Sequence, residues 1–254
     1  MNALIDLAGS LATTALRAGM GTMASPAAHR PTWLFELYEF EGCPYCRLVR
    51  EALTELDLDA LIYPCPKDGT RYRPRAAELG GKMQFPFFVD PGAGVQLYES
   101  ADIVRYLFET YGGRDLPWHW RATALQQAGS AIAGLPRAWA GVRVAPSQPP
   151  QQPLELYSFE ASPFARLVRE RLCELEIAYV LRSVGRSSPG DWVVPAVREA
   201  MRWTYEPETV NRKALLARAG RVSIPYLVDP NTGVEMAESA DILAYLDRYR
   251  AAAS

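Results

Sequence analysis

Two cysteines three residues apart are the side chains in this sequence best suited to chemistry. Cys43 and Cys46 enclose Pro44 and Tyr45, directly after an alternating, aromatic-rich segment at residues 34–40 that predicts a strand. Apolar residues then recur at helical spacing, which predicts a helix beginning near Pro44. At a helix N-terminus, unpaired N–H groups and the helix dipole stabilise a thiolate. We therefore expect Cys43 to be the nucleophile and Cys46 the thiol that resolves a mixed disulfide.

The segment that contains this motif is repeated in the second half of the chain. FEGCPYCRLVRE at residues 40–51 recurs as FEASPFARLVRE at 159–170, and ESADI recurs at 99–103 and 238–242. The apolar N-terminal stretch at residues 1–20 recurs after residue 120, so it is interpreted as a structural helix, not as a targeting segment. We expect two domains, at residues 1–113 and 114–254, each preceded by a helix.

The order of expected elements is the same in each copy. A strand, a helix and a second strand at residues 61–63 precede a connecting region, a hairpin at residues 87–98 and a helix at 101–111, which Ser100 is expected to cap. This βαβ–ββα order predicts an α/β chain made of two tandem thioredoxin-like domains. The second copy carries about twenty extra residues before Ile224, in a stretch with helical spacing broken by prolines.

Composition narrows the function classes. The chain of 254 residues has a net charge of −2, which argues against nucleic-acid binding, and the N-terminal stretch is too short and interrupted to span a membrane. Four cysteines are too few for a disulfide scaffold, so a reducing, cytoplasmic setting is expected. Neither His29 nor His119 has metal-ligand spacing, and no metal site is predicted.

The CPYC motif resembles that of glutaredoxins, and the residues that follow resemble the N-terminal domain of glutathione transferases. The resemblance covers about 80 residues of each copy. It implies a cis peptide at Phe85–Pro86 facing Cys43, and a γ-glutamyl site at Glu99 and Ser100. It also implies glutathione as co-substrate, with these candidate binding residues: Tyr45, Lys82, Phe85, Pro86, Glu99 and Ser100.

Other polar residues near the motif are open to two interpretations. Lys82 and the arginines at positions 71, 73 and 75 are as consistent with holding a glycyl carboxylate as with a solvated surface. Cys65 ends the second strand and is favoured as a bystander, although that edge of the sheet lies near the motif. Cys173 is interpreted as a packing residue.

The second copy replaces both thiols, since Ser162 stands at the position of Cys43 and Ala165 at that of Cys46. Its motif is similar to serine-type glutathione transferases, in which the serine positions the glutathione thiol. That resemblance implies a second candidate site at Ser162, Phe164, Ile224, Pro225, Glu238 and Ser239. Because no large helical domain follows either copy, a degenerate copy that binds or packs is favoured over a transferase site.

Three functions remain in competition. The leading one is a glutathione- or thioredoxin-linked thiol–disulfide oxidoreductase that acts on disulfides or glutathionylated proteins. The second is glutathione conjugation or isomerisation, with Cys43 or Ser162 positioning glutathione. The third is a non-catalytic module, in which the copies pair face to face as an intramolecular pseudo-dimer that holds glutathione, a protein or an iron–sulfur cluster, the cluster not being predicted.

Overall fold

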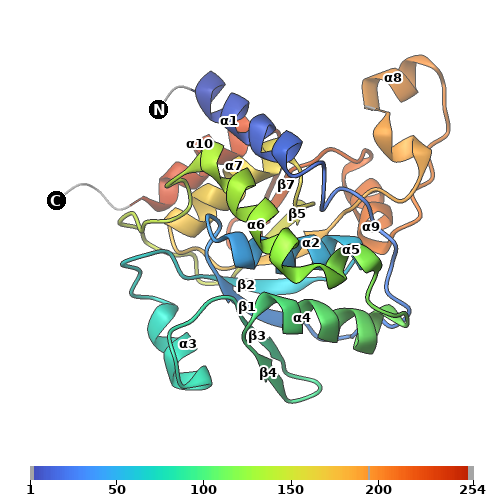
Figure 1. The fold of residues 1–254 in the computed structure, drawn as a ribbon. Helices are drawn as coiled ribbons and strands as arrows, with labels where there is room; N and C mark the ends of the chain where they lie inside the picture. The colour runs from blue at the N-terminus through green and yellow to red at the C-terminus, as the bar shows by residue number, and fades with distance from the viewer. Residues whose placement is uncertain (1–2, 194, 251–254) are drawn as a thin grey trace.

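The computed structural model describes residues 3–193 and 195–250, and the first half follows the expected order (Figure 1). Its elements are α1 (Ala3–Leu16), β1 (Phe35–Glu39), α2 (Pro44–Glu55), β2 (Ala60–Pro64), α3 (Arg73–Gly80), β3 (Phe87–Asp90), β4 (Val95–Leu97), α4 (Ser100–Leu107) and the π-helical turn η1 (Phe108–Gly112). Helix α3 falls in the connecting region, for which the sequence indicated no element.

The second half repeats this order. Its elements are α5 (Trp118–Arg121), α6 (Thr123–Gly134), η2 (Leu135–Arg137), β5 (Leu154–Ser158), α7 (Pro163–Glu174), β6 (Tyr179–Ser183), η3 (Pro189–Trp192), α8 (Pro195–Ala200), α9 (Val210–Ala219), β7 (Tyr226–Asp229), β8 (Val234–Ala237), α10 (Ser239–Leu246) and η4 (Asp247–Tyr249). Helix α9 corresponds to α3, since each ends in a left-handed glycine, Gly220 and Gly81, shortly before a cis proline. The extra residues of the second copy therefore form η3, α8 and the loop after them.

The eight strands found in the described residues form one sheet, in the order β4-β3-β1-β2-β6-β5-β7-β8. Within each copy the first two strands are parallel and the hairpin is antiparallel, as a thioredoxin-like domain requires. The copies meet where β2 pairs antiparallel with β6, with Ile62 opposite Tyr179. They are thus joined edge to edge, not face to face as in the hypothesis of a non-catalytic module. The division at residue 113 stays a prediction.

One apolar core crosses the boundary between the copies. On one face of the sheet, α2, α4, α7 and α10 contribute a continuous set of buried side chains that includes Leu53, Leu107, Leu172 and Leu246. On the other face, α3 and α9 each cover a smaller cluster over their own copy. Fully burying a leucine side chain contributes about 1.5–3 kcal/mol, so this shared core ties the two copies together.

The helix that precedes each copy packs on the other copy. Helix α1 lies against α7, and α6 lies against α2, as Figure 1 shows. Ser10 of α1 donates a hydrogen bond to the carbonyl of Pro163 (2.7 Å), and Ser130 of α6 donates the matching bond to the carbonyl of Pro44 (2.7 Å). The expected helices are present, but they are exchanged between the copies.

A buried ionic cluster fills the space between α2 and α7. Arg50 and Arg169, each 1% exposed, both reach the carboxylates of Glu41 and Glu160, and Arg50 also contacts Glu39. Buried charges are tolerated only when they are paired and hydrogen-bonded. The cluster therefore requires both copies, because each arginine bonds a carboxylate from each side.

Candidate active site: a thiol pair at a helix N-terminus

Cys43 occupies the N-cap of α2, as its position before Pro44 predicts. Its backbone is extended (φ −77°, ψ 121°), and its Sγ accepts a hydrogen bond from the Cys46 N–H at 3.2 Å. Pro44 fills the first turn, where the N–H that it lacks would have no helical partner. Both thiols are free, with Cys43 3% and Cys46 0% exposed.

The two thiols differ in acidity. Burial works against the ionised form of Cys43, but hydrogen bonds from the side chain and backbone of Cys46 lower its pKa below the usual value. Burial, and then the hydrogen bond to Cys43, raise the pKa of Cys46 well above the usual value. This arrangement gives one thiol prone to ionise and one that keeps its proton, as a nucleophile and a resolving thiol require.

The predicted cis peptide at Phe85–Pro86 is confirmed, and Ile224–Pro225 is cis as well. The Phe85 ring meets that of Phe40 edge-on, with centroids 6.4 Å apart, and the Arg73 guanidinium lies 5.0 Å from its centroid. The residue before the cis proline is thus packed against the end of β1, three residues from Cys43.

Glu99 and Ser100 differ from the expectation in one respect. Helix α4 begins at Ser100 itself, and Glu99 is the N-cap residue, so the expected capping role of the Ser100 side chain is wrong. Glu99 has a positive φ of 31°, and Glu238 repeats this with 71°. Such conformations cost energy in non-glycine residues and cluster at functional sites. Among the described residues, the buried Oγ of Ser100 has no hydrogen-bond partner.

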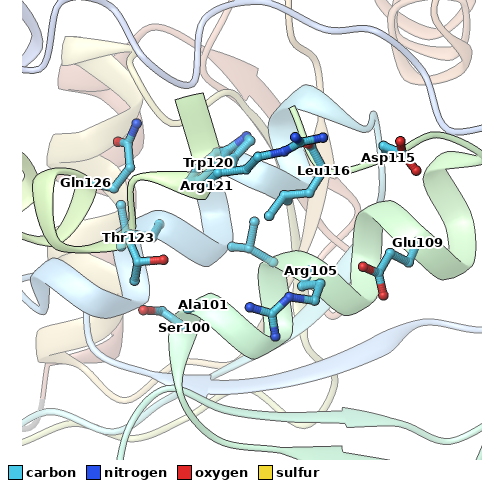
Figure 2. A pocket seen from close by; sticks show the side chains of 12 residues that line it. Ser100, Ala101, Arg105, Glu109, Asp115, Leu116, Trp120, Arg121, Thr123 and Gln126 are labelled. Carbon is cyan, nitrogen blue, oxygen red and sulfur yellow. The ribbon is translucent and has the colours of Figure 1, made fainter. Parts of the chain in front are cut away.

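A cavity of about 350 Å³ opens beside Ser100 (Figure 2). In Figure 2, Ser100 lies at one end of it beneath Thr123, while Glu109 and Asp115 lie at the other. The exchanged helix α6 supplies Thr123 and Gln126 to the wall. The complete lining is Leu48, Ser100, Ala101, Val104, Arg105, Glu109, Asp115, Leu116, Trp120, Arg121, Thr123 and Gln126. Ser100 thus presents an unsatisfied polar atom at a hollow, which fits the carboxylate-binding role that the resemblance implies.

The remaining candidates of the first copy are dispersed. The Lys82 ammonium lies 4.2 Å from the centroid of the Tyr98 ring, and Gln84 donates to the Glu99 carboxylate at 2.5 Å. Tyr45 is nearly half exposed. None of Cys43, Tyr45, Lys82, Phe85, Pro86 and Glu99 lines the cavity beside Ser100.

The three arginines considered for the glycyl carboxylate have other partners. Arg71 donates to the carbonyls of Leu175 (3.0 Å) and Glu176 (2.6 Å) in the second copy, so it joins the two copies. Arg73 donates to the carbonyl of Pro66 (2.6 Å). The Arg75 guanidinium lies over the Tyr63 ring, 3.7 Å from Glu36.

The other two cysteines are buried. Cys65 donates to the carbonyl of Tyr63 (3.4 Å), and burial raises the pKa of its thiol, which suits a bystander. Cys173 lies between the copies instead of among apolar neighbours alone: its Sγ accepts from the Glu41 N–H (3.4 Å) and donates to the Gly141 carbonyl (3.2 Å). The described residues contain no group of three side chains arranged to hold a metal ion.

The second copy keeps the backbone geometry without the thiols. Ser162 is the N-cap of α7, and its Oγ accepts from the Ala165 N–H at 3.2 Å, the distance found for Cys43. Phe164 separates two hollows: one also contains Ser162 and Ile224, and the other contains Ser239. The six second-copy candidates therefore do not line a single cavity.

Sequence reasoning missed the ionic cluster beneath the motif. The signal was present, since RLVRE recurs unchanged as residues 47–51 and 166–170. Charged residues at these spacings look like a solvated helix face, and only the contact between copies buries them. Sequence reasoning also missed the contact of residues 141–142, which follow α6, with the region beside the motif. The Gly42 N–H donates to the Gly141 carbonyl (3.4 Å), and the Lys67 N–H donates to the Val142 carbonyl (2.6 Å).

Comparison with known proteins agrees with the fold. No curated protein and no solved structure gives a significant match. No helix in the described part of the chain is long and apolar enough to cross a membrane. The sequence profile of the family described as "Glutathione S-transferase, N-terminal domain" matches residues 37–115 and 156–253, one segment in each copy and more than half of the chain. The chain therefore belongs to the glutathione S-transferase N-terminal domain family.

Proposed function

We propose that the protein is a glutathione-linked thiol–disulfide oxidoreductase, with Cys43 as the nucleophile, acting in a reducing compartment such as the cytoplasm. The observation that carries the proposal is the geometry of two free thiols in one helical turn, with the Cys43 Sγ at the N-cap of α2 accepting the Cys46 N–H at 3.2 Å. The directions of the pKa shifts, lowered for Cys43 and raised for Cys46, agree with it. A thiolate is the attacking form in disulfide exchange, and a protonated neighbour does not compete with it.

The reaction follows from this difference. The Cys43 thiolate attacks a disulfide, forms a bond to one sulfur and releases the other as a thiolate that takes up a proton. Either Cys46 then attacks the Cys43 sulfur of the mixed disulfide and displaces the other sulfur, or a glutathione attacks that other sulfur and displaces the Cys43 thiolate. The first route leaves a Cys43–Cys46 disulfide that two glutathione molecules reduce, and the second regenerates Cys43 directly. Each step exchanges one S–S bond for another.

Glutathione binding draws support from the first copy. Ser100 offers a buried hydroxyl without a partner at the N-terminus of α4, a position suited to a carboxylate. The tandem copies would act as a fused pair, because α6, which precedes the second copy, forms part of the wall beside Ser100.

The test is glutathione-dependent reduction of a small mixed disulfide. We expect activity in the wild type, a loss of at least about a thousandfold in Cys43→Ser, and wild-type activity in the matched second-copy variant Ser162→Ala. Cys46→Ser should retain reduction of glutathione mixed disulfides, because the second route does not use it. Activity that survives Cys43→Ser would refute the proposal.

One observation favours a second candidate, glutathione conjugation at the second copy. A helical wall was expected to be missing there, but α1 supplies one side of a largely apolar hollow of about 460 Å³ that includes Phe164 and Ser239. Conjugating activity lost in Ser162→Ala and retained in Cys43→Ser would support this alternative.

A further inference from the structure

A second-copy cavity of about 370 Å³ opens at the N-terminus of α7, and we call it the insert cavity. Its wall includes residues from the extra segment that the first copy lacks, among them Trp192 and Arg198. The lining residues that the structure describes are Phe159, Ser162, Pro163, Phe164, Arg186, Asp191, Trp192, Val193, Arg198, Arg212, Val222, Ser223 and Ile224.

Among the described residues of this lining, the one carboxylate, that of Asp191, is already neutralised. Asp191 pairs with Arg212 at 3.2 Å, accepts the Ser187 and Ser188 N–H groups at 2.8 and 3.1 Å, and accepts the Tyr205 hydroxyl. Burial works against its ionised form, but the Tyr205 bond and these partners lower its pKa. Arg212 also donates to the carbonyls of Val184 (3.1 Å) and Gly185 (2.8 Å). The Asp191–Arg212 pair therefore leaves no net charge for the cavity.

Two other arginines in the wall, Arg186 and Arg198, form no ion pair with any carboxylate whose side chain the structure describes. Arg198 is buried and donates to the Gly190 carbonyl at 3.2 Å. The Nε of Arg186 is buried without a hydrogen-bond partner. Uncompensated cations at a partly desolvated site are costly, and an anion in the cavity would offset that cost.

Aromatic surfaces surround these cations. The Arg186 guanidinium lies 4.2 Å from the Trp192 ring centroid and 5.3 Å from that of Phe159, and Phe164 forms another part of the wall. The cavity thus combines flat apolar walls with two positive charges, which suits a ligand with an apolar ring and one anionic group.

The insert cavity overlaps only part of the second-copy glutathione site that the resemblance implies, since Ser162, Phe164 and Ile224 line it. Glu238 and Ser239 are not in its lining, and Ser239 belongs to the hollow on the other side of Phe164. A ligand confined to the insert cavity would not reach the residues expected to hold a γ-glutamyl group. At the position of Arg186, the first copy has the exposed Lys67 and no insert to cover it.

We propose that the insert cavity binds a small aromatic carboxylate, with Arg186 and Arg198 facing the carboxylate and Trp192 and Phe164 contacting the ring. This is binding, not catalysis, and it is separate from thiol exchange at Cys43.

Calorimetric titration of the full chain with benzoate tests the proposal. We expect one benzoate per chain, accompanied by a change in Trp192 fluorescence that Trp192→Phe removes. Arg186→Gln should weaken binding by about tenfold or more, as loss of a charge-assisted hydrogen bond does, and Arg198→Gln should act in the same direction. The matched control Lys67→Gln should leave benzoate affinity unchanged.

Three further ligands define the chemistry. Benzyl alcohol lacks the charge and acetate lacks the ring, so each should bind at least about tenfold more weakly than benzoate. Reduced glutathione should leave benzoate affinity unchanged. Absence of benzoate binding, equal affinity in Arg186→Gln with an unchanged circular dichroism spectrum, or competition by glutathione would each overturn the proposal. The titration does not depend on activity at Cys43.

Discussion

The two helix N-termini of this molecule have the same geometry and different chemistry. Cys43 and Ser162 each cap a twelve-residue helix, and each accepts a backbone N–H three residues on at 3.2 Å. Around them, Arg50 and Arg169 are matched, and so are Glu41 and Glu160. The second copy lacks both thiols. It also lacks one carboxylate of the ionic cluster, because Ser158 stands where the first copy has Glu39. The comparison teaches that the scaffold of the site is shared, whereas its reactive groups and one buried charge belong to the first copy.

The largest expected effect comes from the matched arginines. Arg50→Met removes the arginine that pairs with Glu39 and one of the arginines that pair with Glu41 and Glu160, whereas Arg169→Met removes one partner from Glu41 and Glu160 only. Breaking a buried ionic cluster costs about 3–5 kcal/mol, so urea unfolding should show a loss of this size, greater for Arg50→Met. The control Arg105→Met removes an exposed pair with Asp102 and should be nearly neutral. Equal stability of all three variants would refute the structural role of the cluster.

Glu39, which has no counterpart in the second copy, and Glu160 should contribute to the stability of the protein with opposite pH dependences. Burial raises the pKa of Glu39 from 4.5 to about 7, so its contribution to stability is full below pH 4.5 and is lost as the pH rises through about 7. Burial opposes ionisation of Glu160, but Arg169 and Arg50 hold its pKa at about 2. Its contribution is therefore present above pH 4.5 and is lost as the pH falls toward 2.

Two isosteric variants separate these contributions. The free energy of unfolding of the wild type relative to Glu39→Gln should decrease as the pH rises from 4.5 past 7. Relative to Glu160→Gln, it should decrease as the pH falls from 4.5 toward 2. Urea unfolding across the pH range measures both free-energy differences. If they changed with pH in the same direction, the proposed difference between Glu39 and Glu160 would be contradicted.

Restoring a thiol to the second copy tests whether the shared geometry suffices for reactivity. The thiol introduced by Ser162→Cys would occupy the same N-cap position as Cys43, with the same N–H directed at it. Measured in a Cys43→Ser background, its alkylation by iodoacetamide at pH 7 should proceed within about tenfold of the rate for Cys43. A thiol that alkylates only near pH 9 would show that the first copy depends on more than its helix N-terminus.

The smallest effect concerns the exchanged helices. Ser130→Ala removes the hydrogen bond to Pro44 in the thiol motif, and Ser10→Ala removes its counterpart to Pro163. Each should cost about 1 kcal/mol of unfolding free energy. Only Ser130→Ala should also slow disulfide reduction, because Pro44 lies between the two thiols. If Ser10→Ala slowed disulfide reduction by the same amount, the specific role of the Ser130–Pro44 bond at the thiol site would be refuted.

Local sequence was sufficient for the elements and for much of the thiol site. Strand alternation and the proline after Cys43 predicted the strands and the N-terminus of α2, because these depend on residues close together in the chain. The cis peptide at Phe85–Pro86 was predicted from the family resemblance. Comparing the two copies also revealed the insert, although not the cavity that it helps to form.

The contacts between the copies could not be predicted in the same way. The apolar composition of α1 predicted a helix but not the copy that it contacts, and its buried residues are the polar Ser10 and Thr13. Arg50 and Arg169 occupy positions typical of a solvated helix face, and they are buried only because β2 pairs with β6. The role of Ser100 changed for a local reason, since a positive φ at Glu99 starts the helix one residue earlier than expected.

The exchange of α1 and α6 has a consequence for synthesis of the chain on the ribosome. Helix α2 is synthesised long before α6, the helix that packs on it. Helix α1 is synthesised first, but its partner α7 is the last of the four. The first copy therefore leaves the ribosome with part of its apolar surface uncovered and with the ionic cluster lacking Glu160 and Arg169. Such contacts between distant segments slow folding and prolong exposure to aggregation. The thiol site consequently reaches its final form only after the second copy, which carries no reactive thiol pair, has been synthesised.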